Sequence, residues 1–151
     1  MLLLDQLAPR ETAASATVTL TFDERKKSRQ RLVLDGGAEA ALMLPRGTVL
    51  AEGDRLTGPQ AVVVAVKGAP ERLSVVLSDD PWTLARAAYH LGNRHVPLQV
   101  LPGELRYQHD HVLDDMVRRL GLAVEERQAV FSPEGGAYLP AHEHRLLARH
   151  P

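Results

Sequence analysis

The sequence of 151 residues predicts an α+β protein, in which a small N-terminal β domain precedes a ferredoxin-like domain of the order β-α-β-β-α-β. Two observations support this fold class. Residues 1–70 contain short alternating strands separated by glycine and proline turns. Residues 71–136 combine two amphipathic helical stretches with four short strands. Residues 137–151 are expected to form a mobile tail that contains histidines.

The strands of the first domain are indicated by their alternation and by the turns between them. Apolar side chains alternate with threonines along residues 17–22, with Phe22 as the last apolar position. Residues 31–34 and 39–44 flank the sequence Asp35-Gly36-Gly37. This pattern predicts a β-hairpin, because glycine supplies the positive φ that a tight turn needs.

The first helix of the second domain has clear start and stop signals. Asp80 is a typical N-cap residue, and Pro81 suits the first helical position because its missing N–H is not needed there. Gly92-Asn93 predicts the C-terminal end of this helix. One broad apolar face is predicted, formed by Trp82, Leu84, Ala85, Ala88, Tyr89 and Leu91.

The second helix is expected to begin near Asp110 and to be capped by Gly121. Its solvent side carries two predicted ion pairs with i,i+4 spacing, Asp114–Arg118 and Asp115–Arg119. The four strands of this domain are predicted at residues 72–77, 96–101, 104–108 and 123–131.

The composition argues against several classes of function. Lys and Arg number 18, Asp and Glu number 19, and aromatic residues make up only 4%, so neither polyanion binding nor base stacking is indicated. The absence of cysteine excludes disulfides, thiolate zinc sites and iron–sulfur clusters. The apolar opening Met1–Leu4 stops at Asp5 and is too short for a signal peptide or a membrane span. We therefore expect a soluble, intracellular protein with no nucleic-acid or membrane partner.

Histidines in the second half of the chain are the main candidates for function. Four fall within 22 residues, namely His90, His95, His109 and His111. Three more lie near the C-terminal end, namely His142, His144 and His150. Imidazole is the commonest metal ligand in proteins. A ligand set without thiolates suits Ni²⁺, Zn²⁺, Cu²⁺ or Co²⁺ better than Ca²⁺ or Mg²⁺.

The spacing of these histidines leaves their individual roles open. His90 lies in the last predicted helical turn, where a cation interacts favourably with the helix dipole, so it can cap the helix instead of binding metal. On a continuous helix His90 and His95 would lie about 140° apart, but the Gly92-Asn93 stop places His95 beyond the helix. His109 and His111 can chelate in extended backbone and diverge in a helix. The pattern favours a loose or shared metal site, with ordinary surface histidines as the alternative.

Several sequence blocks point to a known family. The most specific is the run Leu91-Gly-Asn-Arg-His95-x-Pro-x-Gln99. Blocks at 102–107 and 110–116 follow this run, and blocks at 25–31 and 44–47 precede it. With these blocks in register, nearly the whole chain resembles the UreE family of urease accessory proteins, the nickel chaperones of urease maturation. The resemblance implies a homodimer, with an N-terminal β domain and a ferredoxin-like metal-binding domain in each chain.

The resemblance also implies roles for the histidines. It places His95 at the two-fold axis of the dimer, where the two copies together hold one Ni²⁺. It makes His109 and His111 secondary ligands for copper or nickel, and Zn²⁺ or Cu²⁺ are implied substitutes for Ni²⁺. The family's tail adds further ligands, which here would be His142, His144 and His150. The implied partners are the urease apoprotein and the GTPase complex of urease maturation, in the cytoplasm.

Two other functions compete with this interpretation. A metal-dependent hydrolase would need His95, His109 and His111 to converge on one metal at about 2.0–2.1 Å, with a general base nearby. A metal-free peptide-binding module built on the β domain would need no metal at all. The five basic residues within 25–31 are interpreted as a solvated loop, with docking to the maturation proteins as the alternative hypothesis.

Overall fold

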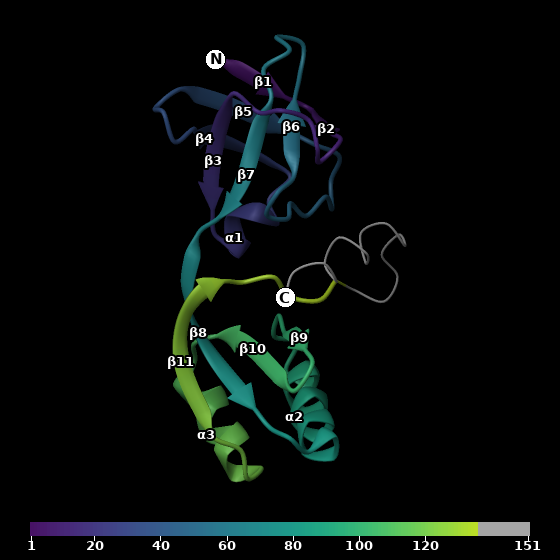
Figure 1. Cartoon of the computed structure of the whole chain (residues 1–151), viewed down its shortest axis with the longest axis vertical. Helices are drawn as coiled ribbons and strands as arrows, with labels where there is room; N and C mark the ends of the chain where they lie inside the picture. The colour runs from purple at the N-terminus through teal and green to yellow at the C-terminus, as the bar shows by residue number, and fades with distance from the viewer. Residues whose placement is uncertain (136–151) are drawn as a thin grey trace. The chain divides into compact units, whose positions relative to one another are not determined.

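The computed structural model describes residues 1–135 and divides into two compact units, Met1–Ala69 and a second that begins at Pro70 (Figure 1). Strands dominate the first unit, and the described part of the second combines strands with two helices. This arrangement confirms the predicted α+β class, with a β domain ahead of a ferredoxin-like domain. Within residues 1–135, no helix is both long enough and apolar enough to cross a membrane.

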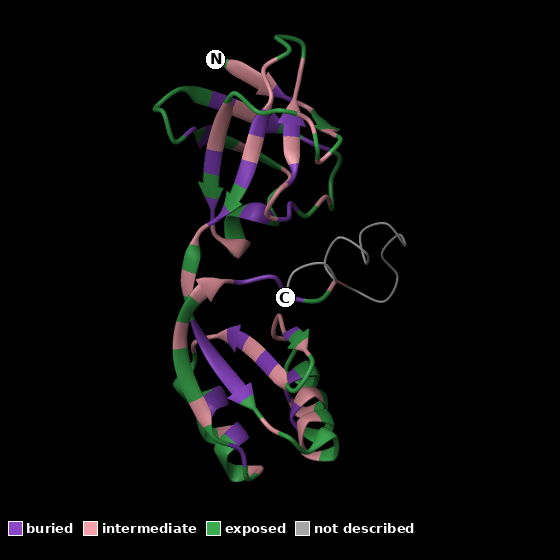
Figure 2. Cartoon of the chain, viewed as in Figure 1, coloured by how far each residue is buried: buried purple, intermediate pink, exposed green. Residues whose placement is uncertain are grey.

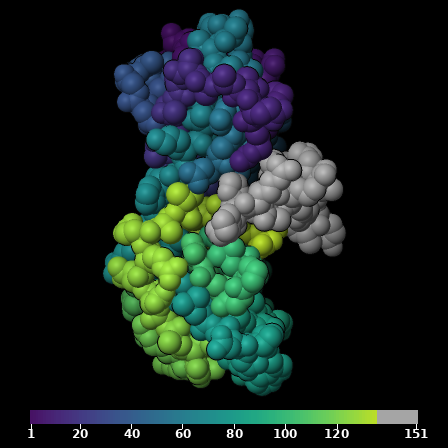
Figure 3. All heavy atoms as spheres, in the orientation of Figure 1, coloured from purple at the N-terminus to yellow at the C-terminus, as the bar shows by residue number. Residues whose placement is uncertain are grey.

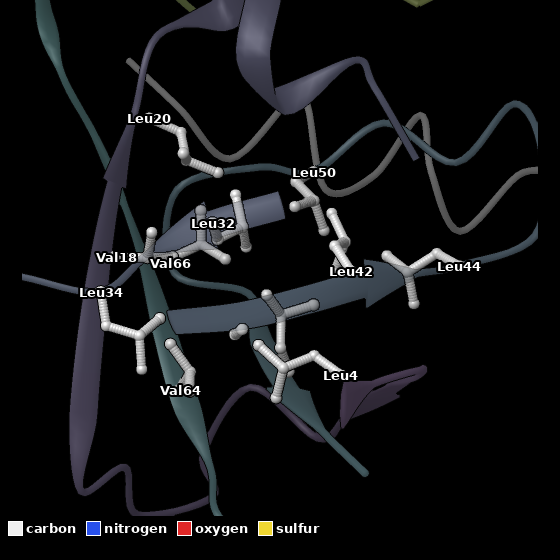
Figure 4. Close-up of a cluster of buried hydrophobic side chains, with 12 residues drawn as sticks. Leu4, Val18, Leu20, Leu32, Leu34, Leu42, Leu44, Leu50, Val64 and Val66 are labelled. Atoms are coloured by element: carbon white, nitrogen blue, oxygen red, sulfur yellow. The ribbon is translucent and has the colours of Figure 1, made fainter. Parts of the chain in front are cut away.

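The first unit consists of two sheets that share one apolar core. Its elements are β1 (Leu2–Leu4), β2 (Gln6–Ala8), β3 (Ala16–Leu20), α1 (Phe22–Arg25), β4 (Arg29–Val33), β5 (Glu39–Met43), β6 (Arg55–Thr57) and β7 (Val64–Gly68). One sheet has the order β1-β5-β4 and the other β2-β6-β7-β3. Buried positions alternate with more exposed ones along several strands (Figure 2). Side chains from both sheets, including Leu4, Leu42, Val18 and Val64, meet in the cluster of Figure 4.

Local sequence explains both the predicted hairpin and an error beside it. The hairpin of β4 and β5 is confirmed, and Gly37 in its turn has a φ of +99°. The predicted strand through Phe22 is wrong, because β3 ends at Leu20 and α1 begins at Phe22. Thr21 starts this short helix with a capping box, in which Thr21 and Glu24 each bind the other's backbone N–H through a side-chain oxygen.

The second unit has the ferredoxin-like topology that the order of elements predicts. Its elements are β8 (Pro70–Leu77), α2 (Pro81–Asn93), β9 (Gln99–Leu101), β10 (Glu104–Gln108), α3 (His111–Arg119) and β11 (Val124–Val130). The sheet has the order β11-β8-β10-β9, and each neighbouring pair is antiparallel. Both helices share a buried cluster with this sheet, which includes Ala87, Leu91, Leu113, Val117, Val76 and Leu105.

The ends of both helices follow from their capping residues. Asp80 caps α2 by accepting the backbone N–H of Trp82 at 3.2 Å, as predicted. Asp110 caps α3 and accepts two backbone N–H groups of its first turn. Gly121, which follows α3 with a φ of +92°, donates its N–H to the carbonyl of Arg118 at 2.9 Å.

The chain after β11 returns to the loop that precedes β9. Residues 131–133 are buried, and the backbone N–H of Ser132 donates to the side-chain oxygen of Gln99 at 3.1 Å. The N–H of Glu134 donates to the carbonyl of Leu98 at 2.8 Å. These two bonds fix where the described chain ends relative to the segment between α2 and β9.

Candidate metal site

His95 lies just beyond the C-terminal end of α2. The helix ends at Asn93, and the N–H of His95 donates to the carbonyl of Gly92 at 3.0 Å. The φ of His95 is +58°, in the left-handed region that usually holds glycine at a helix end, because a β-carbon there costs roughly 1–2 kcal/mol. Strained residues of this kind cluster at functional sites. His95 is therefore an exposed imidazole residue in a strained backbone at the end of a regular helix.

The residues after His95 form one wall of a pocket that contains the second candidate ligand. Val96 and Pro97 line this pocket of about 150 Å³, and His109 and Asp110 line it from the junction of β10 and α3. The loop after α2 and the start of α3 therefore meet at one surface. This surface connects the segment around His95 with His109.

His109 and His111 occupy different structural positions although one residue separates them. His109 follows β10, its N–H donates to the carbonyl of Arg72 at 3.1 Å, and its side chain is 24% exposed. His111 is the first residue of α3 and is exposed. Asp110 between them has extended backbone and serves as the N-cap.

A buried polar network holds the ring of His109 from one side. Asp114 Oδ1 accepts the hydroxyl protons of Ser74 and Tyr107, each at 2.6 Å. His109 Nδ1 lies 3.2 Å from Ser74 Oγ and 3.5 Å from Asp114 Oδ2. Asp114 and Ser74 are both buried. This network links β8, β10 and α3 through four side chains.

The predicted solvent-side ion pairs of α3 are wrong. Asp114 is only 4% exposed and binds the hydroxyls of Ser74 and Tyr107, whereas Asp115 lies 3.4 Å from Arg118, at i,i+3 spacing. The sequence does not reveal the role of Asp114, because its partners come from β8 and β10 and not from neighbouring turns of the helix.

The network determines the protonation of its phenol. Burial, together with the hydrogen bond to Asp114, raises the pKa of Tyr107 far above its ordinary value. Tyr107 therefore remains a hydrogen-bond donor to the carboxylate throughout the neutral range. Glu126, 3.9 Å from His109 Nδ1, has a pKa lowered first by its hydrogen bond from Arg72 and also by the nearby imidazole.

The outer face of α2 exposes two large aromatic side chains. Trp82 is 67% and Tyr89 69% exposed, and α2 lies along one outer side of the second unit (Figure 3). The guanidinium of Arg86 lies 4.9 Å from the centre of a Trp82 ring. The predicted apolar face was therefore too broad, because Ala87 and Leu91 are buried in the core while Trp82 and Tyr89 are exposed.

The site of a single chain is incomplete for the three-histidine hydrolase. Within residues 1–135, no group of three or more His, Asp or Glu side chains is arranged to hold a metal ion. Ser74 and Asp114 beside His109 do not form a hydrolase triad either, because the buried Ser74 hydroxyl donates to Asp114 instead of the imidazole. His142, His144 and His150 lie outside the described residues.

Comparison with known proteins identifies the family. Sequence models of the C-terminal and N-terminal domains of the UreE urease accessory protein match residues 71–151 and 3–69. This chain belongs to the UreE family. The urease accessory protein UreE of Pseudomonas putida (strain W619) is 56% identical over 153 residues, covering 100% of this chain and 95% of that protein. UreE of Citrobacter koseri is 55% identical over 139 residues, covering 91% of each chain.

Membership of the UreE family makes this chain a urease accessory protein and not an enzyme, in agreement with the resemblance noted in its sequence. The fold also explains one position of the run that first suggested UreE. Gln99 is 2% exposed and binds the N–H of Ser132, so its amide has a structural role in attaching the C-terminal segment.

Proposed function

We propose that this UreE protein is a cytoplasmic nickel metallochaperone, which delivers Ni²⁺ during assembly of the urease active site. In this proposal, His95 from each of two subunits holds one Ni²⁺ at the two-fold axis. The observation that carries the proposal is the position of His95, which is exposed and held with a φ of +58° at the end of α2. Two-fold symmetry duplicates each ligand that lies on the axis, so a single histidine per chain contributes two imidazoles.

The outer face of α2 supports a homodimer. Trp82 and Tyr89 are seven residues apart and lie on one side of the helix. Arg86 lies between them in sequence, and its guanidinium stacks on the Trp82 ring. Tryptophan, tyrosine and arginine are the residues that contribute most to protein interfaces. Asn93 lies eleven residues after Trp82, which is about three helical turns, so it continues the same side of the helix toward His95. A second copy on this face would therefore bring two His95 residues near one axis.

The remaining ligands are proposed to come from the other histidines. His109 and His111 are auxiliary ligands, and the tail supplies His142, His144 and His150. The bond of Glu134 to Leu98 supports a contribution from the tail. Glu134 is the second-last described residue, and its partner Leu98 is only three residues beyond His95 in sequence. The seven residues from Gly135 to His142 span at most about 25 Å. Imidazole ligands also accept Zn²⁺ or Cu²⁺ in place of Ni²⁺.

Delivery requires release as well as binding. Imidazole binds metal only when deprotonated, so affinity should fall below a pH of about 6.5. The proposed receivers are the urease apoprotein and the GTPase complex of urease maturation. Four exposed basic residues support a docking contact in the first unit, namely Lys26, Lys27, Arg29 and Arg31. Arg25 does not belong to this surface, because it is 2% exposed.

The His95→Ala substitution tests the shared site. We expect titration calorimetry of the full chain to show loss of the tightest Ni²⁺ site, at about one ion per dimer. The matched control is His90→Ala, on the neighbouring turn of α2, which should keep that site. Unchanged stoichiometry and affinity in His95→Ala would overturn the assignment. Sedimentation should find a dimer, and the melting temperature should rise when Ni²⁺ is added.

A further inference from the structure

The network of Ser74, Tyr107 and Asp114 contacts His109 but has no role in the proposed function so far. It lies on the Nδ1 side of the imidazole, where Ser74 Oγ and Asp114 Oδ2 are 3.2 and 3.5 Å from the nitrogen. Ser74 and Asp114 are 0% and 4% exposed. A histidine that binds metal commonly donates its other ring N–H to such a buried group.

The protons available in this network determine which ring nitrogen of His109 carries a hydrogen. A serine hydroxyl has one proton, and Ser74 donates it to Asp114 Oδ1 at 2.6 Å. Ser74 Oγ can therefore only accept a hydrogen bond from His109. Asp114 Oδ2 is also an acceptor, because an ionised carboxylate has no proton to donate. Both atoms that face Nδ1 therefore require it to be a donor.

The rest of the network keeps Asp114 in this arrangement. Tyr107 donates its own single hydroxyl proton to Asp114 Oδ1 at 2.6 Å and is 0% exposed. The carboxylate is thus held by two short hydroxyl bonds from β8 and β10. Glu126, the other acidic group near Nδ1 at 3.9 Å, is paired with Arg72 at 2.7 Å. The Glu126 carboxylate is also an acceptor, so it favours the same tautomer of His109, with the proton on Nδ1.

We propose that Asp114, acting through Ser74, holds His109 in the Nδ1–H tautomer and so presents Nε2 as the nitrogen that binds a metal ion. Asp114 is in this role a positioning residue and not a ligand. The ring of His109 is 24% exposed and lines the pocket beside Val96 and Pro97, which gives an ion access to it. The metal half of this inference rests on the proposed function, whereas the tautomer half does not.

The tautomer can be measured without metal and without substitution. Nitrogen-15 NMR separates a protonated ring nitrogen from an unprotonated one by chemical shift. The metal-free full chain would be measured at a pH well above the ordinary imidazole pKa of about 6.5. We expect His109 to carry its proton on Nδ1, whereas a solvated histidine such as His111 should show a mixture. A predominant Nε2–H form of His109 would overturn the proposal.

The Asp114→Asn substitution should weaken the preference for the Nδ1–H tautomer. The amide oxygen would take the place of Oδ1 and accept from Ser74 and Tyr107, so Ser74 Oγ would remain an acceptor, whereas the amide N–H₂ would replace Oδ2 beside His109 Nδ1. Nδ1 would then face one acceptor and one donor, and the proton should be found on both ring nitrogens. The matched control is Tyr107→Phe, which removes one bond to Asp114 and should leave the tautomer unchanged. A mixture of tautomers in the first variant alone supports the proposal, and an unchanged tautomer in Asp114→Asn overturns the role of Asp114.

A titration with diamagnetic Zn²⁺, followed at the ring nitrogens, tests the metal half. We expect His109 Nε2 to shift on binding, and affinity at this imidazole to fall about ten- to hundredfold in Asp114→Asn. A response of His95 without any response of His109 would overturn the presentation of Nε2 and leave the shared site intact. If neither histidine responds while His109 keeps its proton on Nδ1, the proposed function fails and the tautomer assignment holds.

Discussion

The buried side-chain oxygen of Gln99 accepts the backbone N–H of Ser132 at 3.1 Å, which joins the C-terminal segment to the first residue of β9. A buried N–H that loses its acceptor costs about 1–3 kcal/mol. Gln99→Ala should therefore lower the free energy of unfolding by that amount, as measured by urea denaturation. Gln128→Ala, at an exposed position of β11, is the control and should change stability by no more than about 0.5 kcal/mol. Equal effects of the two substitutions would argue against a structural role for the Gln99 amide.

The left-handed backbone at His95 predicts an unusual order of stabilities. Glycine adopts a φ of +58° freely, whereas alanine there retains the cost of a β-carbon. We expect His95→Gly to be more stable than His95→Ala by about 0.5–1 kcal/mol, after allowing for the greater entropy of glycine in the unfolded chain. Chemical denaturation of the two variants measures the difference. Greater stability of the alanine variant would contradict backbone strain at this position.

The aromatic face of α2 predicts how dimerisation can be disrupted. Trp82→Glu should weaken self-association by about 2 kcal/mol or more, roughly thirtyfold in the dissociation constant, because it places charge within the proposed interface. Sedimentation at several concentrations measures this effect. Val33→Glu is a suitable control, since Val33 in the first unit is also 67% exposed. If Trp82→Glu and Val33→Glu remain equally dimeric, the contact uses another surface.

Two adjacent basic residues should respond differently to truncation. Arg25 is buried, and its guanidinium faces the carbonyls of Leu20 and Leu50 at 3.4 and 3.5 Å. Arg25→Ala should therefore lower the free energy of unfolding by about 1–3 kcal/mol, whereas Lys26→Ala should change it by no more than about 0.5 kcal/mol. Urea denaturation of both variants provides the comparison. Tests of docking should consequently neutralise the exposed members of the basic stretch and keep Arg25.

The carboxylate of Asp35 predicts a pH dependence of the first unit. The hydroxyl of Thr17 donates to it at 2.6 Å and, with Thr19 and Lys67, lowers its pKa below the ordinary value. A carboxylate whose folded pKa is lowered stabilises the protein above its unfolded value, and this contribution is lost as the pH falls below about 4. The stability difference between the wild type and Asp35→Asn should therefore shrink on acidification. Urea denaturation at a series of pH values would contradict this if the difference stayed constant.

Signals within one segment of chain predicted most of the second unit. The capping residues Asp80 and Asp110 located both helix starts, because an N-cap acts on backbone groups two or three residues away. The strand at Glu104–Gln108 was predicted with its observed bounds. The order of elements then sufficed for the ferredoxin-like topology, since few arrangements of such a sequence are allowed.

Apart from the strand predicted through Phe22, the errors concern side chains whose surroundings come from distant segments. Asp114 has the spacing of a surface ion pair, but its partners lie on other elements and make it a buried acceptor. Arg25 belongs to a highly charged stretch, yet its side chain is buried in the first unit. Trp82 and Tyr89 are apolar residues at helical spacing, and only the packing of the helix shows that they face outward. Burial of these side chains therefore required the structure, whereas most of the local conformation did not.

The hydrogen bond from Ser74 to Asp114 joins β8 to α3, and the same hydroxyl oxygen lies 3.2 Å from His109 Nδ1. If α3 lay an ångström further along the sheet, the bond from Ser74 to Asp114 would be lost, and the Ser74 hydroxyl would be free to donate to His109 Nδ1 instead. The position of the proton on this imidazole therefore depends on how firmly one helix packs against its sheet.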